Sequence, residues 1–240
     1  MTDQESVEYS NLTGARMLLE PYEGWSRRIP DDSAEWRKKL FPLIRGIKNA
    51  ELDGGRTLRE IAAELYVAAG LFEAFPDGSH GALNKIPQAA TESRTPEVLR
   101  EIAGHLENWR SDWRTWDETP MDVWELGLRF PRLSQILPIY FGQDGVAISD
   151  DMHDATSEDG IRMYIDETHP RCPWRLPSVV AECYQAMALF HTEEQMDRFF
   201  SSEAMKGGSG TEDFVDFFPL LARLCVEHLR EAHSPLWEPR

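Results

Sequence analysis

The chain has 240 residues, of which 41% are hydrophobic and 28% are charged, and its formal net charge is −17. This composition is typical of folded globular proteins and differs from that of disordered chains. The excess of acid disfavours direct binding to nucleic acids and to anionic lipids, because a negative surface repels phosphate groups. We therefore expect a globular protein with no direct nucleic-acid partner and no membrane partner.

Targeting signals and disulfide patterns are not apparent in the sequence. No apolar run approaches the roughly 20 residues needed to cross a bilayer, and the first residues, Met1 to Glu5, lack the layout of a secretory signal. The three cysteines, Cys172, Cys183 and Cys225, contain no CxxC pair, which disfavours a disulfide framework or a zinc ribbon. A cytoplasmic protein with reduced thiols is expected.

Residues 1–30 are predicted to form an irregular N-terminal lead-in. Pro21, Gly24 and Pro30 interrupt any helical period there, and glycine and proline are the strongest local breakers of regular structure. The folded domain is therefore expected to begin near residue 31.

Two helices are predicted next in the chain. Asp32 or Ser33 is a suitable N-cap for the first. Thr57 and Glu60 form a capping-box pattern at the start of the second. The stretch near residues 76–94 is rich in glycine, proline, serine and asparagine, so we interpret it as a loop.

The clearest helical pattern begins at Thr95-Pro96-Glu97, where a capping residue precedes a proline and a carboxylate. Apolar residues then recur at spacings of three and four, which predicts one buried face: Leu99, Ile102, Leu106, Trp109, Trp113 and Trp116. The aromatic stripe Trp109, Trp113 and Trp116 belongs to the core or lines a ligand pocket or partner groove, and the sequence leaves both interpretations open.

The second half of the chain continues the helical pattern. Helices are predicted over residues 121–130 and 133–141, followed by a loop near 142–160 in which a small β element could form near 145–149. Past Pro177, a further helix is expected to bury one face, formed by Val180, Cys183, Met187 and Phe190.

The last predicted helix covers about residues 211–232, and the glycine-rich segment 206–210 before it is interpreted as a flexible joint. Its inward residues are expected to be Phe214, Phe217, Leu221, Leu224 and Cys225. The fold class predicted from these patterns is all-α, with about seven to nine helices packed in a single compact domain over residues 31–240. A mixed α+β fold is the alternative.

The segment Asp150-Asp151-Met152-His153-Asp154 resembles the DDxxD motif of class I isoprenoid synthases. The resemblance covers five residues, and it implies that Asp150, Asp151 and Asp154 bind Mg²⁺ and, through it, a diphosphate. Closely spaced carboxylates are hard oxygen ligands of the kind that this ion prefers. The alternative interpretation is a solvated acidic loop.

A wider acidic stretch surrounds this motif. Between residues 144 and 167, Arg162 is the one basic residue among eight acids: Asp144, Asp150, Asp151, Asp154, Glu158, Asp159, Asp166 and Glu167. Such a stretch could dock a basic protein, although charge runs are commonly just solvated.

Other common signatures of catalysis are absent from the sequence. It has no HExxH, ExxH or HxxxH pattern for a helix-borne metal site, no GxSxG and no phosphate-binding glycine motif. The segment His169-Pro170-Arg171-Cys172-Pro173-Trp174 contains a Cys-Pro step, as some haem-responsive sites do. We interpret this segment as a turn stiffened by proline that carries a packing tryptophan.

Two hypotheses about function follow. The first is a non-enzymatic interaction protein, similar to an immunity or inhibitor protein, that docks a basic partner through Asp144, Asp150, Asp151, Asp154, Glu158 and Asp159 without a cofactor. The second is a small helical enzyme that uses Asp150, Asp151 and Asp154 to hold Mg²⁺ and a diphosphate. The sequence determines neither the oligomeric state nor whether the protein is an enzyme.

Overall fold

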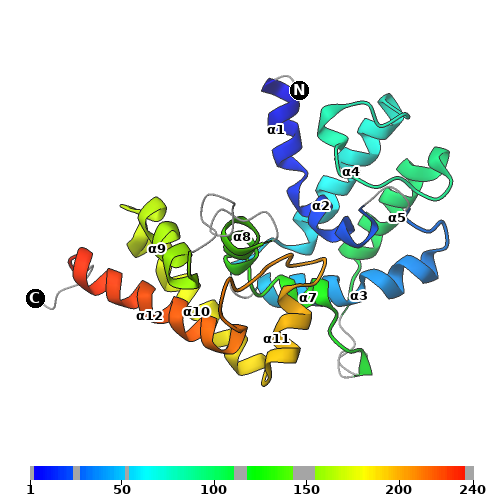
Figure 1. Cartoon of the computed structure of the whole chain (residues 1–240). Helices are drawn as coiled ribbons and strands as arrows, with labels where there is room; N and C mark the ends of the chain where they lie inside the picture. Colours follow the sequence, from blue (N-terminus) through cyan, green and yellow to red (C-terminus); the bar gives the residue numbers. More distant parts are fainter. Residues whose placement is uncertain (1–2, 24–27, 52–53, 111–117, 143–154, 236–240) are drawn as a thin grey trace, which may run out of the picture. The chain divides into compact units, whose positions relative to one another are not determined.

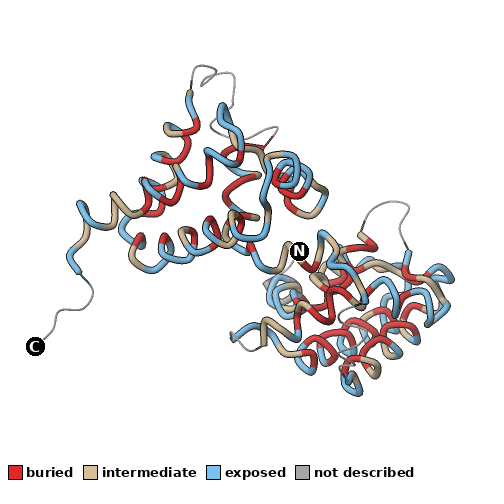
Figure 2. The backbone as a smooth tube through the Cα atoms, turned by 90° about the horizontal axis from the view of Figure 1, so that it is seen from below, coloured by how far each residue is buried: buried red, intermediate tan, exposed pale blue. Residues whose placement is uncertain are grey.

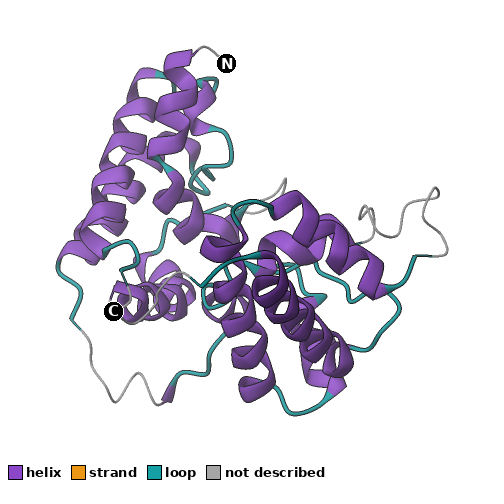
Figure 3. Ribbon diagram, turned by 90° about the vertical axis from the view of Figure 1, so that its left-hand side faces the viewer, coloured by secondary structure: helices purple, strands orange, loops and turns teal. Residues whose placement is uncertain are grey.

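A computed structural model describes residues 3–23, 28–51, 54–110, 118–142 and 155–235. Within these ranges the chain forms eleven α-helices, joined by loops and short 3₁₀ or π turns (Figures 1 and 3). An isolated bridge between Ile29 and Ala89 is the one β pairing that the described ranges contain. The all-α prediction is therefore confirmed, with more helices than expected, whereas the proposed β element near 145–149 lies outside the described residues.

The chain divides into two compact units, residues 1–128 and residues 129–240, which we describe separately. The single domain expected over residues 31–240 stays a prediction. No helix in the described ranges is both long enough and apolar enough to span a bilayer.

The first unit contains six of the helices. They are α1 (Asp3–Asn11), α2 (Thr13–Leu19), α3 (Ser33–Ala50), α4 (Leu58–Ala74), α5 (Thr95–Glu107) and α7 (Val123–Gly127). Buried residues recur along one side of the helices (Figure 2). Together they form one apolar cluster, to which α2, α3, α4 and α5 all contribute.

The irregular lead-in predicted for residues 1–30 is wrong over its first part, because α1 and α2 occupy residues 3–19. Long-range contacts explain the difference. The buried carboxylate of Glu64 on α4 accepts a hydrogen bond of 2.9 Å from the backbone N–H of Ala15. A Cβ at Gly14 would lie 2.9 Å from the Ile61 side chain, so the glycine permits α2 to approach α4 closely.

Helix starts agree well with the predictions. The Asp32 side chain accepts a hydrogen bond from the Ala34 N–H, and Thr57 and Glu60 form the complete capping box. At α5 the cap is one residue earlier than expected, at Arg94, and Thr95 is the first helical residue.

The predicted extension of this helix to Trp116 is wrong, because α5 ends at Glu107. The side chain of Asn108 donates a hydrogen bond of 2.8 Å to the carbonyl of Gly104, which satisfies an acceptor of the last turn. Trp109 is partly buried against the core of the first unit. Trp113 and Trp116 lie outside the described residues, so their role stays a prediction.

A buried ion pair joins α3 to α7. The Nε and Nη2 atoms of Arg45 donate to the two carboxylate oxygens of Glu125 at 2.8 and 2.7 Å, and Nη1 donates to the carbonyl of Thr119 at 2.8 Å. Both side chains are at most 4% exposed. Because the guanidinium donates to both carboxylate oxygens, each buried charge has a hydrogen-bonded partner in place of water.

Glu125→Gln is expected to destabilise the protein by about 3–5 kcal/mol, because it leaves the buried guanidinium without a counter-charge. Glu73→Gln removes the same charge from an exposed pair with Arg100 and should cost far less, because solvent screens such a pair. Urea unfolding of the two variants measures the difference. Equal losses would show that the buried pair has no special role.

The second unit contains α8 (Leu133–Ile136), α9 (Ser157–Thr168), α10 (Cys172–Leu189), α11 (Glu193–Phe200) and α12 (Phe214–Ala232), with a π-helical turn at Leu137–Phe141. Its core is rich in phenylalanine, and Phe200 packs with ring-centroid distances of 5.4, 5.3 and 4.7 Å against Phe130, Phe214 and Phe218. All five residues predicted to face inward on the last helix are buried.

Two local predictions for this unit need correction, and one further helix was missed. In α10, Cys183 is buried as expected, but the buried face continues through Leu176, Val179 and Ala186, so it is displaced from the predicted one. The predicted loop near 142–160 ends earlier, because a capping box of Thr156 and Asp159 starts α9 at Ser157. The helix α11 was not predicted.

The glycine-rich segment 206–210 is a loop, as predicted, but its backbone is packed closely. A Cβ at Gly208 would lie 2.1 Å from the carbonyl oxygen of Phe141, and a Cβ at Gly207 would lie 2.6 Å from Leu137. The hydroxyl of Ser157 donates to the Ser209 carbonyl at 2.7 Å and accepts from the Thr211 N–H at 2.9 Å. Glycine is needed in this segment because the backbone lies so close to neighbouring residues, and not because the segment must move freely.

Glu182 is a buried carboxylate that caps a helix from another part of the chain. It accepts hydrogen bonds of 2.9 Å from the backbone N–H groups of Arg132 and Leu133 at the start of α8. Burial raises the pKa of Glu182 to about 7, although these hydrogen bonds act in the opposite direction.

This raised pKa predicts a pH-dependent stability. Between the ordinary carboxyl pKa of about 4.5 and a pH of about 7, the folded state holds a proton that the unfolded state has lost. The free energy of unfolding should therefore fall across this window, by on the order of 1–3 kcal/mol from Glu182. Glu182→Gln should remove that part of the slope in urea unfolding at pH 5 and pH 7.5. Glu194→Gln controls for the change in net charge, and an unchanged slope in Glu182→Gln would contradict the assignment.

Candidate metal centre

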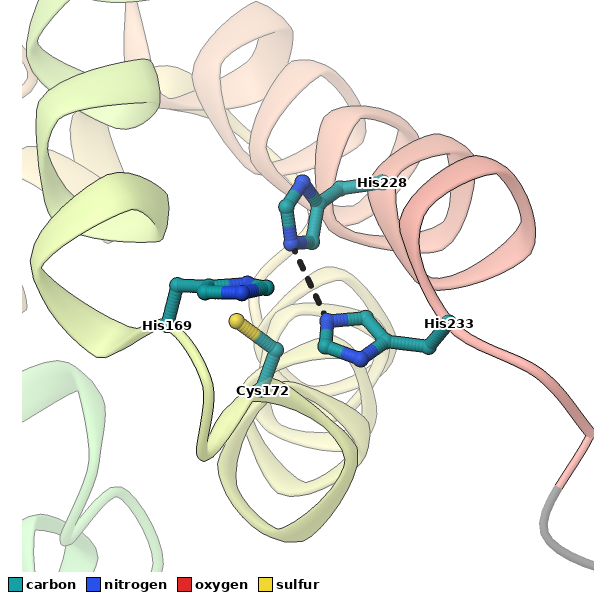
Figure 4. Close-up of side chains that lie close together, drawn as sticks. All are labelled: His169, Cys172, His228 and His233. Carbon is teal, nitrogen blue, oxygen red and sulfur yellow. Dashed lines mark hydrogen bonds between the residues drawn. The ribbon is translucent and has the colours of Figure 1, made fainter.

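Four side chains that commonly bind metal ions meet where three helices of the second unit end or begin (Figure 4). His169 directly follows α9, and Cys172 is the first residue of α10. His228 lies near the end of α12, and His233 directly follows that helix. The chain thus brings two short segments together, residues 169–172 and residues 228–233.

The four residues are close enough to share one ion. One ring nitrogen from each histidine and the Cys172 sulfur all lie within 4.8 Å of one another. The Nε2 atoms of His228 and His233 are 3.3 Å apart. Two nitrogen ligands at about 2.0 Å from a tetrahedral Zn²⁺ ion are also about 3.3 Å apart. The pair already has the spacing of two ligands, and the other two ligand atoms lie within 4.8 Å of it.

Exposure differs among the four residues. Cys172 is fully buried, His228 and His233 are half-buried, and His169 is exposed. The thiol of Cys172 lies 3.7 Å from the carbonyl oxygen of Ile165 and donates to it. An ion bound here would have a buried sulfur on one side and the exposed imidazole on the other.

The pKa shifts of His228 and Cys172 bear on whether these side chains can bind a cation. Burial is the main cause that lowers the pKa of His228, and His233 and His169 lower it further. This favours the neutral imidazole, the form that donates a lone pair to a metal. Burial raises the pKa of the Cys172 thiol, and a bound cation would offset that effect by stabilising the thiolate.

Sequence reasoning missed this cluster. The familiar metal motifs lie on one helix, whereas these four residues come from a His-x₂-Cys segment and a His-x₄-His segment. Such gaps are typical of structural zinc sites. Residues five apart do not share a helix face, but His233 follows the end of α12 in an extended conformation (φ −132°, ψ 137°), which lets its ring approach that of His228.

The interpretation of residues 169–174 as a turn with a packing tryptophan is correct only in part: residues 169–171 form a turn, but α10 begins at Cys172 and Trp174 is 77% exposed. The residue of this segment that packs is Cys172.

The acidic candidates are only partly described. Asp144, Asp150, Asp151 and Asp154 lie outside the described residues. Glu158 pairs with Arg162 along α9, and Asp159 completes the capping box of that helix. The magnesium site and the docking of a basic partner both stay predictions.

Comparison with known protein families, with curated proteins and with solved structures gives no match for this chain.

Proposed function

We propose that the second unit is a zinc-binding helical module in which His169, Cys172, His228 and His233 hold one ion. The observation that carries this proposal is the convergence of four ligand atoms within 4.8 Å, from segments far apart in the chain.

The ligand set favours zinc among the common metals. Three imidazole nitrogens and one thiolate suit a borderline-soft ion, whereas Mg²⁺ and Ca²⁺ require oxygen ligands. Four protein ligands would also fill a tetrahedral shell. Closed shells of this kind are typical of structural sites, whereas catalytic zinc keeps a position for water.

The role of the ion would be to join helix ends. Cys172 starts α10 and His228 lies near the end of α12, two helices that pack along each other, and His169 ties in the end of α9. Because an ion held only by the folded state adds its binding free energy to stability, zinc would stabilise this unit.

Zinc is expected to bind the metal-stripped full-length protein with 1:1 stoichiometry in calorimetric titration. At about one hundred times Kd, free zinc should add about 2.7 kcal/mol to the free energy of unfolding. His228→Ala should weaken binding by about tenfold or more, whereas His191→Ala, which removes an exposed histidine outside the cluster, should leave it unchanged.

Cobalt provides a second test with a spectroscopic readout. Co²⁺ bound by Cys172 should give a thiolate-to-cobalt charge-transfer band, and Cys172→Ser should lose that band. Absence of saturable zinc binding in the wild-type protein, or equal effects of His228→Ala and His191→Ala, would refute the proposal.

A further inference from the structure

A second site in this unit gathers positive charge in a strongly acidic chain. A cavity of about 190 Å³ lies among α8, the π-helical turn, the last turn of α9 and the first turn of α10. Its polar lining comprises Arg132, Arg171, Arg175, Tyr140, Tyr164 and Glu167, together with Gln135 and Thr168. Three arginines therefore face one carboxylate, although the whole chain carries a net charge of −17.

In the described parts of the chain none of the three guanidinium groups forms an ion pair within 4.0 Å, although Arg132 interacts electrostatically with the buried Glu182. The recorded ion pairs of this unit join Arg162 to Glu158 and Arg223 to Glu227, on α9 and α12. The one acid of the cavity, Glu167, instead accepts a hydrogen bond from the hydroxyl of Tyr140. An anion in the cavity would relieve the mutual repulsion of the arginines.

The walls also suit an oxygen-rich ligand. Arginine presents a planar fork of N–H donors that matches phosphate and carboxylate oxygens. The rings of Tyr140 and Tyr164 meet edge to face at 5.5 Å. Tyr140 belongs to the π-helical turn, a distortion that often occurs at functional sites. Ile136 and Ile139 add an apolar edge next to these polar groups.

We propose that this cavity binds a phosphate group, either as inorganic phosphate or as the head of a small phosphomonoester. A doubly charged tetrahedral oxyanion matches three cationic forks better than a single carboxylate does, because it has more acceptor oxygens and more charge. A volume of about 190 Å³ suits a phosphate group rather than a whole drug-sized ligand, for which pockets of about 300–1,000 Å³ are usual. The proposal does not depend on the metal centre.

The test is calorimetric titration of the metal-stripped full-length protein with inorganic phosphate and, separately, with phenyl phosphate, at constant ionic strength in chloride. Saturable 1:1 binding of at least one probe is expected. Tighter binding of phenyl phosphate would indicate a monoester, and equal or weaker binding would indicate free phosphate. Heat that does not saturate, or no heat with either probe, would overturn the proposal.

Matched variants separate a built site from general electrostatic attraction. Arg175→Gln removes an exposed arginine that lines the cavity and should weaken binding about tenfold, equivalent to about 1.4 kcal/mol. Arg198→Gln removes the same charge from α11, away from the cavity lining, and should change binding less than about twofold. Equal weakening by the two variants would refute a specific site.

A further variant makes the two proposals distinguishable. His228→Ala should weaken zinc binding and leave phosphate binding unchanged, whereas Arg175→Gln should weaken phosphate binding and leave zinc binding unchanged. Circular dichroism of each variant confirms that the helices are intact. Loss of phosphate binding in His228→Ala with intact helices would contradict the independence of the two sites.

Discussion

The packing of α10 against α12 is the constraint on which the second unit depends. Leu176, Val179 and Cys183 are buried on α10, and Phe217 and Leu221 are buried on α12. Burial of side chains of this size stabilises each by about 1.5–3 kcal/mol relative to exposure. Because side chains in close-packed helices interdigitate, sliding one helix along the other would break many contacts at once. The beginning of α10 and the end of α12 are thereby held at a fixed separation, and the candidate metal ligands are placed at those ends.

Much of the fold could be predicted from the sequence because local rules determine it. Asp32, Thr57 and Glu60 cap their helices as expected, and the spacing of Phe214, Phe217 and Leu221 identified the buried face of α12. The predictions fail where the structure depends on contacts between residues that are distant in the sequence. Helix α2 packs on α4 through contacts such as that of Ala15 with Glu64, and α1 packs on the 3₁₀ turn at Gly81–Leu83; no local pattern indicates either contact. The end of α5 at Glu107, inside an apparently continuous apolar seam, is another such case.

The candidate site could be predicted much less well than the fold. His169 and Cys172 lie near the start of α10, and His228 and His233 lie near the end of α12. The two pairs meet only because α10 packs along α12. The spacing within each pair is visible in the sequence. It indicates a metal site only when the structure shows that the two pairs lie close together. The same holds for the arginine-lined cavity. Arg132 precedes α8, whereas Arg171 and Arg175 belong to the start of α10, and only the tertiary structure shows that they share a cavity.

The closely packed glycine segment restricts how this protein could be altered. A stretch such as Lys206 to Gly210 would ordinarily be chosen as a place to insert a tag, to join a second domain or to open the chain for circular permutation. Here the backbone of Gly208 lies against Phe141, and Ser157 holds both sides of the segment through hydrogen bonds. Added residues would displace α12 from α9 and from the π-helical turn. The exposed turn around Asp77 and Gly78 in the first unit is restricted in another way: a Cβ at Gly78 would make only ordinary van der Waals contacts, but the backbone there has a φ of +71°, which favours glycine.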